Sequence, residues 1–167
     1  MTWLTHSVFA YFSASVLGIN PFIASLGSTA PDWFEDFLGV NEHRGITHYL
    51  VFWFGSLIIS FIFYLLYPGN FLTSAVFSFV YGGFTHILLD SLTVSGVPLG
   101  FGNVRVRIGG IIKTSSLSEY VFLAVVIFAF MPFVFTGSSI GFNSYKGLYE
   151  KGIIDKKEYE ELKFKFF

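Results

Sequence analysis

The sequence predicts an all-α protein, a polytopic helical bundle in a membrane, and its composition and charge pattern are the reasons. Of the 167 residues, 53% are apolar and 21% aromatic, while only 13% are charged. Soluble domains carry about 25% charged residues, so this composition excludes a soluble globule and also intrinsic disorder. Four long stretches contain no Asp, Glu, Lys or Arg, and they cover 1–31, 45–89, 91–104 and 120–145.

The remaining composition removes several function classes. There is no cysteine, which excludes disulfides, thiolate zinc sites and cysteine nucleophiles. The formal net charge is −1 and the pI is about 6.4, so there is no electrostatic signature of nucleic-acid binding.

Three segments are expected to be full membrane spans, because about 20 apolar residues cross the roughly 30 Å hydrocarbon core. They are Ile46–Tyr67, Phe71–Leu92 and Tyr120–Thr136. The third contains Pro132, which neighbouring helices tolerate in a membrane. The short turn at 68–70 makes the first two spans an antiparallel hairpin.

The N-terminal segment Ser7–Ala30 is long enough to span, but Gly18–Pro21 interrupts it. It is either a kinked span or two short helices, about 7–17 and 22–30, that form a re-entrant hairpin. A straight helix over Ser7–Ala30 would be about 36 Å long at 1.5 Å per residue and would hold His6 and Asp32 at its opposite ends. We expect the chain to double back, which returns His6 to the face where Asp32 lies.

The rest of the chain divides into a membrane body, 1–140, and a polar tail, 145–167. Alternation over Val104–Ile108 predicts a short strand or β-hairpin at the membrane surface. Of the 21 charged residues, 11 lie between Lys146 and Phe167. The tail is expected to be a small helical hairpin, with Gly152 ending its first arm and a capping box of Asp155 and Glu158 starting the second.

Ionisable residues in apolar segments are costly and are usually functional. His86 and Asp90 are four residues apart, so they share a helix face and can bind a metal or pair with each other. The segment 43–48 begins with His43 and Arg44 and places His48 at the start of a span. Each of these patterns also has an ordinary structural reading as a helix cap, a snorkelling arginine or a hydrogen bond between helices.

The antiparallel hairpin brings these groups to one membrane face. Asp32, Glu35 and His43 precede the start of one span, and Asp90 ends the next. Imidazole and carboxylate together suit a divalent metal ion, with Zn²⁺ expected first and Mn²⁺, Fe²⁺, Ni²⁺ or Mg²⁺ as alternatives. The expected ligands are drawn from His6, Asp32, His43, His48, His86 and Asp90.

Such a centre indicates metal-assisted hydrolysis, because a bound metal lowers the pKa of its water to about 7. A spare carboxylate, Glu35 or else Asp36, is the expected proton acceptor, and Arg44 is expected to hold an anionic group of the substrate in the catalytic site. Arg105 and Arg107 are expected to bind an anionic substrate group. An ester or phosphoester, which includes those of lipids, is the expected substrate class.

The ordered motifs resemble the membrane-bound metal-dependent hydrolase family that includes LexA-regulated inner-membrane proteins. The match covers about residues 5–120. Its motifs are Thr5-His6, Pro31-Asp32 with Glu35, the segment 43–48, and His86 to Thr93 with Gly96. Glu119 resembles a further acid of the family. Many members have a second Asp at the position of Phe34, so Glu35 or Asp36 would substitute here. The resemblance implies an integral protein of a bacterial or archaeal cytoplasmic (inner) membrane.

Two other readings remain open. The same polar residues could serve a metal or proton carrier, although carriers need polar groups through the membrane depth and here they gather at one end. The chain could also be a scaffold, because its tail resembles a short C-terminal helical module that implies oligomerisation or docking to another protein. Membrane lipid is the other expected partner.

Overall fold

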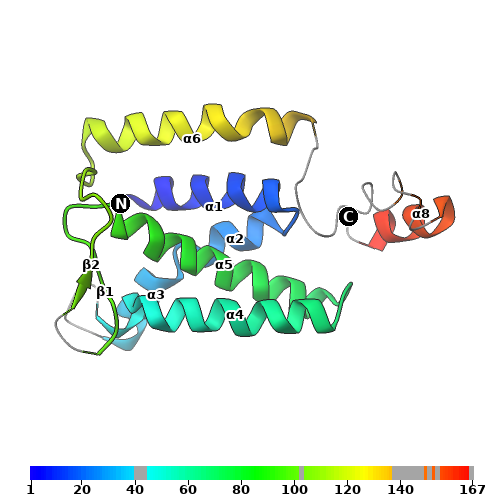
Figure 1. The fold of residues 1–167 in the computed structure, drawn as a ribbon, viewed down its shortest axis with the longest axis horizontal. Coiled ribbons are helices and arrows are strands. Elements are labelled where there is room, and N and C mark those ends of the chain that lie inside the picture. Colours follow the sequence, from blue (N-terminus) through cyan, green and yellow to red (C-terminus); the bar gives the residue numbers. More distant parts are fainter. Residues whose placement is uncertain (40–44, 102–103, 137–148, 150–151, 153–154, 166–167) are drawn as a thin grey trace.

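The computed structural model describes residues 1–39, 45–101, 104–136, 149, 152 and 155–165. Most of these residues are helical (Figure 1). In chain order the elements are α1 (Trp3–Leu17), α2 (Pro21–Gly27), α3 (Ala30–Leu38), the 3₁₀ turn η1 (Ile46–His48), α4 (Leu50–Leu66), α5 (Phe71–Ser91), β1 (Val97–Pro98), β2 (Arg105–Val106), α6 (Leu117–Thr136) and α8 (Lys156–Lys165).

The N-terminal segment doubles back, which is the second of the two arrangements that its sequence allowed. Gly18 ends α1 in the left-handed conformation, with φ of 70°, and its N–H bonds the carbonyls of Ala14 and Ser15. Asn20 then caps α2 through a bond from the N–H of Ile23, and Pro21 occupies the first turn. The reversal brings the start of α3 back to the start of α1, where the side chains of Trp3 and Asp32 are 2.6 Å apart.

The predicted hairpin of two long helices is present as α4 and α5. Gly69 adopts φ of 78° in the turn, and Asn70 caps α5 by accepting bonds from the N–H groups of Leu72 and Thr73. Their directions place the beginning of α4 and the end of α5 at one end of the molecule (Figure 1).

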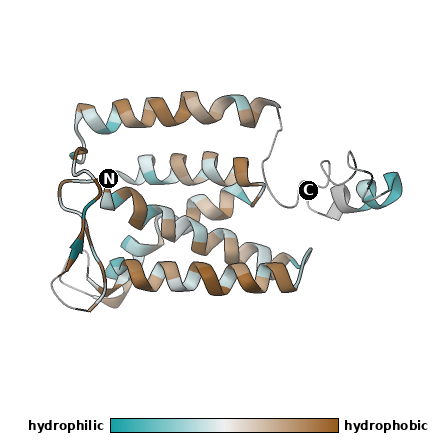
Figure 2. Cartoon of the chain, in the orientation of Figure 1, coloured by the Kyte–Doolittle hydropathy of each residue, from teal (hydrophilic) through white to brown (hydrophobic). Residues whose placement is uncertain are grey.

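Two described helices, Phe71–Ser91 and Leu117–Phe135, are long and apolar enough to cross a membrane, fewer than the three full spans expected. The first expected span begins with η1, and Tyr49 then adopts an extended conformation, so α4 has only 17 residues. At 1.5 Å per residue α4 is about 26 Å long, slightly less than the roughly 30 Å core. Apolar colouring nevertheless dominates the long helices (Figure 2).

Close approach of α2 and α5 is made possible by glycine. A Cβ on Gly82 would lie 2.0 Å from the carbonyl oxygen of Ala24, and one on Gly27 would lie 2.0 Å from that of Phe79. Gly83 similarly leaves room for the ring of Trp53. Small residues let helix backbones approach in membrane proteins, and here they bring α2 and α4 against the same helix.

The helix α6 is attached to the beginning of α1 through Glu119, which is fully buried. One carboxylate oxygen accepts bonds from the N–H and hydroxyl of Thr2 at 2.6 and 2.8 Å and from the hydroxyl of Thr5 at 2.7 Å. The other accepts from the N–H of Ser115 at 2.7 Å. Glu119 is thus a fully bonded link between two helices that are far apart in sequence.

The predicted β-hairpin is present but short. β1 and β2 are antiparallel, with Val97 opposite Val106. The N–H of Ile108 donates to the carbonyl of Ser91 at 2.7 Å, which attaches the hairpin to the end of α5.

In the tail, Asp155 and Glu158 form the predicted capping box, in which each accepts a bond from the backbone N–H of the other. Tyr149 stacks on Tyr159, with ring centroids 5.1 Å apart. Most of the first predicted arm lies outside the described residues.

Candidate metal centre

Three histidines and three acids gather where α1 begins and α5 ends. They come from four segments: His6 from α1, Asp32 and Glu35 from α3, His48 from η1, and His86 with Asp90 from α5. The three histidines and Asp90 are almost completely buried. We call His6, Asp32, His48, His86 and Asp90 the histidine–aspartate cluster.

His86 is oriented by the backbone of the loop after α2. Its Nδ1 lies 2.6 Å from the carbonyl oxygen of Ser28. A carbonyl only accepts, so Nδ1 carries the proton and Nε2 presents its lone pair. That nitrogen lies 3.7 Å from Asp32 Oδ1 and 3.8 Å from Asp90 Oδ2.

His48 lies between two carboxylates. Its Nδ1 is 2.9 Å from Glu35 Oε1, and its Nε2 is 3.3 Å from Asp32 Oδ1. Glu35 Oε1 also accepts bonds from the N–H of Gly45 and the hydroxyl of Thr47. Glu35 therefore lies behind His48, on the side of the ring away from Asp32, as in the carboxylate–histidine pairs that orient metal ligands.

Asp32 is the more exposed acid of the cluster, with 17% of its side chain accessible. Its Oδ2 accepts a bond of 2.6 Å from the indole N–H of Trp3, so Oδ1 is the oxygen that faces His48 and His86. Burial acts to raise the pKa of Asp32, but the close approach of the His48 and His86 rings and the indole hydrogen bond together lower it to about 2. Asp32 is consequently a carboxylate at neutral pH.

His6 and Asp90 form the other side of the cluster. His6 Nε2 is 3.4 Å from Asp90 Oδ1, and its ring stacks on that of His86 with centroids 3.8 Å apart. The amino group of Met1 also donates to Asp90 Oδ1, at 2.6 Å.

The cluster fits a divalent metal by its chemistry. Within the described residues, both ring nitrogens of His6 and Nε2 of His86 are buried and make no hydrogen bond. Buried polar atoms without partners are rare and costly, and a bound ion is one feature that accounts for them. Two sets of three can each bring one ligand atom per residue within 4.8 Å of the others, and these are His6, His86 and Asp90, and Asp32, His48 and His86.

Other residues expected at the site lie elsewhere. His43 and Arg44 fall outside the described residues. Arg105 and Arg107 are exposed on the β-hairpin, and Arg105 donates to the carbonyl of Ser95. This hairpin is at the same end of the molecule as the cluster (Figure 1), but among the described contacts neither arginine touches it.

Sequence reasoning missed Trp3 and Ser28. Trp3 follows the first residues of an apolar segment, where an aromatic residue at a membrane interface is ordinary. Ser28 contributes its backbone carbonyl, which no side-chain pattern reveals.

The fold and the site together define a helical integral membrane protein with a buried histidine–aspartate cluster at one end. Residues 1–145 match the family described as YdjM inner membrane protein, and the chain belongs to this family. It is an integral inner membrane protein. No curated relative and no solved structure matches the chain.

Proposed function

We propose that this protein is a membrane-bound hydrolase that uses a divalent metal ion, Zn²⁺ before the other candidates, to cleave an ester or phosphoester. The observation that carries the proposal is the convergence of three imidazoles and two carboxylates in one buried cluster. Nitrogen and oxygen ligands together suit Zn²⁺, Mn²⁺, Fe²⁺ and Ni²⁺. When bound, such an ion lowers the pKa of a coordinated water to about 7 and polarises the scissile group.

The protein supplies the orientation of its ligands. Ser28 and Glu35 hold the Nδ1 protons of His86 and His48, which leaves both Nε2 atoms directed at Asp32. Trp3 holds the remaining oxygen of Asp32. Outer bonds of this kind commonly change metal affinity 10- to 100-fold when removed.

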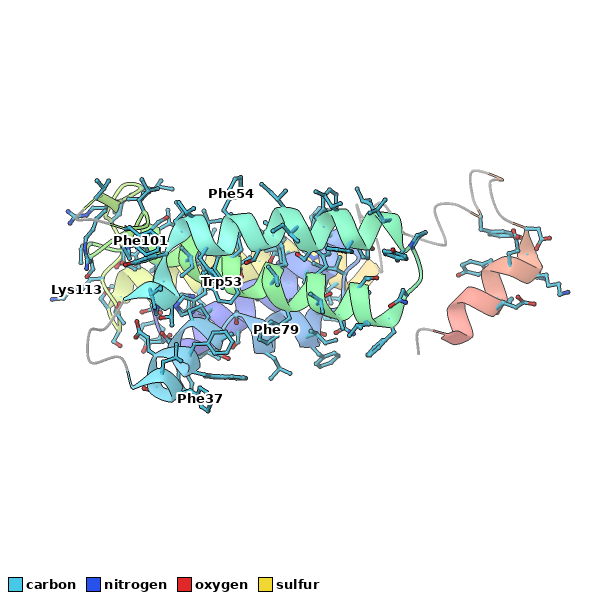
Figure 3. All side chains as sticks on the ribbon, turned by 90° about the horizontal axis from the view of Figure 1, so that it is seen from below. Phe37, Trp53, Phe54, Phe79, Phe101 and Lys113 are labelled. Atoms are coloured by element: carbon cyan, nitrogen blue, oxygen red, sulfur yellow. The ribbon has the colours of Figure 1, made fainter. Side chains whose placement is uncertain are left out.

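A lipid-like substrate is proposed because exposed apolar side chains lie beside Asp32, on the same helix and at the start of α1. Trp3 is 54% exposed beside Asp32, and Trp33 and Phe34 of α3 are also exposed. Phe37 of the same helix is 88% exposed and points outward (Figure 3). Arg44, Arg105 and Arg107 are the proposed contacts for an anionic headgroup.

The test begins with bound metal. The full-length protein is purified in detergent, its metal content is measured, and metal-stripped protein is titrated with Zn²⁺ and Mn²⁺. We expect Asp32→Asn to weaken binding more than tenfold, whereas Asp36→Asn, an exposed acid on the same helix, leaves it unchanged. Equal binding by the two variants would contradict the proposal, as would a wild-type protein that binds no metal.

Hydrolysis is then assayed with chromogenic esters and phosphoesters in mixed micelles. Activity should require the added ion and should be lost with His48→Ala. Metal binding without hydrolysis of any of these substrates, together with metal flux in proteoliposomes, would favour a carrier instead.

A further inference from the structure

The ring planes of the three histidines decide how many ions the cluster can hold. An imidazole nitrogen binds a cation through a lone pair that lies in the plane of its ring. Two histidines can therefore share one ion only where their ring planes cross near it. A single nitrogen with one lone pair also serves one ion at a time.

His48 and His86 satisfy this condition. Their planes are inclined by 67° and their centroids are 5.2 Å apart, with both Nε2 atoms near Asp32 Oδ1. Asp32, His48 and His86 form one of the two sets whose ligand atoms all lie within 4.8 Å of one another, and Asp90 is not in that set. These three side chains offer two nitrogens and one oxygen, and catalytic zinc sites have three protein ligands with a fourth position open for water.

His6 and His86 do not satisfy the condition that the two ring planes cross near a shared ion. Its ring is inclined by only 14° to that of His86 and stacks on it at 3.8 Å, so the two lone pairs lie in nearly parallel planes. A cation in the plane of one ring is then well out of the plane of the other. His6 instead faces Asp90 Oδ1, while His86 faces Asp90 Oδ2.

We infer that the cluster provides two unequal metal positions: a tighter one made by Asp32, His48 and His86, and a weaker one made by His6 and Asp90 Oδ1. This inference rests on the proposed metal-dependent function and adds the number of ions and the assignment of each ligand.

The inequality follows from the ligands. His6 and Asp90 Oδ1 give the second position two described ligands, against three for the first. The amino group of Met1 lies 2.6 Å from Asp90 Oδ1, so a cation at this oxygen must compete with it.

The experiment counts ions rather than turnover. Metal-stripped full-length protein in detergent is titrated with Co²⁺ and followed by its visible absorption, and the bound metal is measured after equilibrium dialysis. We expect two ions per chain, the second binding at least tenfold more weakly. In His6→Gln, and also in His6→Ala, we expect one ion with the affinity of the first.

His48→Ala is the matched variant for the tighter position, and it should abolish the tight phase. Thermal unfolding of the metal-stripped variants shows which remain folded, and His6→Gln keeps a polar side chain of similar length if alanine does not fold. One ion in the wild type, weakened by either His6 variant, would overturn the inference, because all five side chains would then serve one ion. Two ions in His6→Gln would overturn it as well, whereas no ion in the wild type would refute the proposed function itself.

Discussion

At the scale of single residues, Glu35 can have either of two chemical roles: it accepts a proton during catalysis, or it orients the ring of His48. The sequence predicts a proton acceptor, while its carboxylate lies 2.9 Å from Nδ1 of His48, on the far side of the ring from Asp32. A carboxylate in this place fixes the ring and makes its other nitrogen a better ligand. The two roles differ in what a substitution changes.

We expect Glu35→Gln to weaken Zn²⁺ binding about 10- to 100-fold, because the neutral amide holds the Nδ1 proton less strongly. Competition with a chromophoric chelator measures the affinity, and Asp36→Asn again serves as the control. Unchanged metal affinity with a large loss of turnover would instead identify Glu35 as the proton acceptor.

The residues of the histidine–aspartate cluster could be named from the sequence because each lies in a charge-free segment or beside one. An imidazole or carboxylate in such a segment costs free energy that only a partner or a bound ligand offsets. Trp3 could not be named in this way, since its bond to Asp32 depends on α1 and α3 meeting after a reversal of the chain. The ring planes of His6 and His86 are equally invisible in a linear pattern.

At the scale of elements, close packing of α2 against α5 controls the cluster. Gly82 allows the carbonyl of Ala24 to touch α5, and the next turn carries Ser28, whose carbonyl holds His86. On the other side, Trp53 packs against Gly83 and donates to the carbonyl of Thr47, next to His48. The glycines therefore set the positions of both imidazoles.

We expect Gly82→Ala to destabilise the protein by about 1–3 kcal/mol, because the added Cβ would lie 2.0 Å from a backbone oxygen that cannot move without its helix. Thermal unfolding in detergent measures the effect. The matched control is Gly55→Ala in α4, where an added Cβ meets nothing within 4 Å and alanine favours the helix by about 1 kcal/mol. Equal unfolding temperatures for the two variants would show that α2 and α5 are not in contact.

The elements themselves were largely predictable. Asn-Pro after glycine marked the reversal between α1 and α2, and the Pro68–Asn70 turn marked that between α4 and α5. The beginning of α4 was not predictable, because hydropathy does not distinguish a 3₁₀ turn and an extended Tyr49 from the helix that follows. That short interruption is what places His48 beside Glu35.

At the scale of the whole molecule, Glu119 joins α6 to the beginning of α1. Its carboxylate accepts four hydrogen bonds in a buried place, and bonds to a charged acceptor contribute about 1.5–3 kcal/mol each. Thr5 is one of the donors, and it precedes His6 in the first turn of α1.

We expect Glu119→Gln to lower the free energy of unfolding by about 2 kcal/mol and the unfolding temperature by about 4–8 °C. The reason is that the glutamine amide places an N–H donor opposite groups that themselves donate hydrogen bonds. Hydrogen exchange of the amides at residues 3–6 should accelerate at the same time. Glu161→Gln, an exposed acid of α8, is the control and should change neither quantity. Unaltered exchange at residues 3–6 would show that Glu119 does not anchor α1.

The link between Glu119 and the two threonines also sets an order of events during biosynthesis. The partner that locks the first helix is translated more than a hundred residues after it, when α4 and α5 have already been synthesised. Until α6 enters the bilayer, the first turn of α1 lacks the acceptor that Glu119 provides for Thr2 and Thr5. A nascent chain halted before residue 117 should therefore hold the first turn of α1, and with it His6, less firmly than the finished protein does.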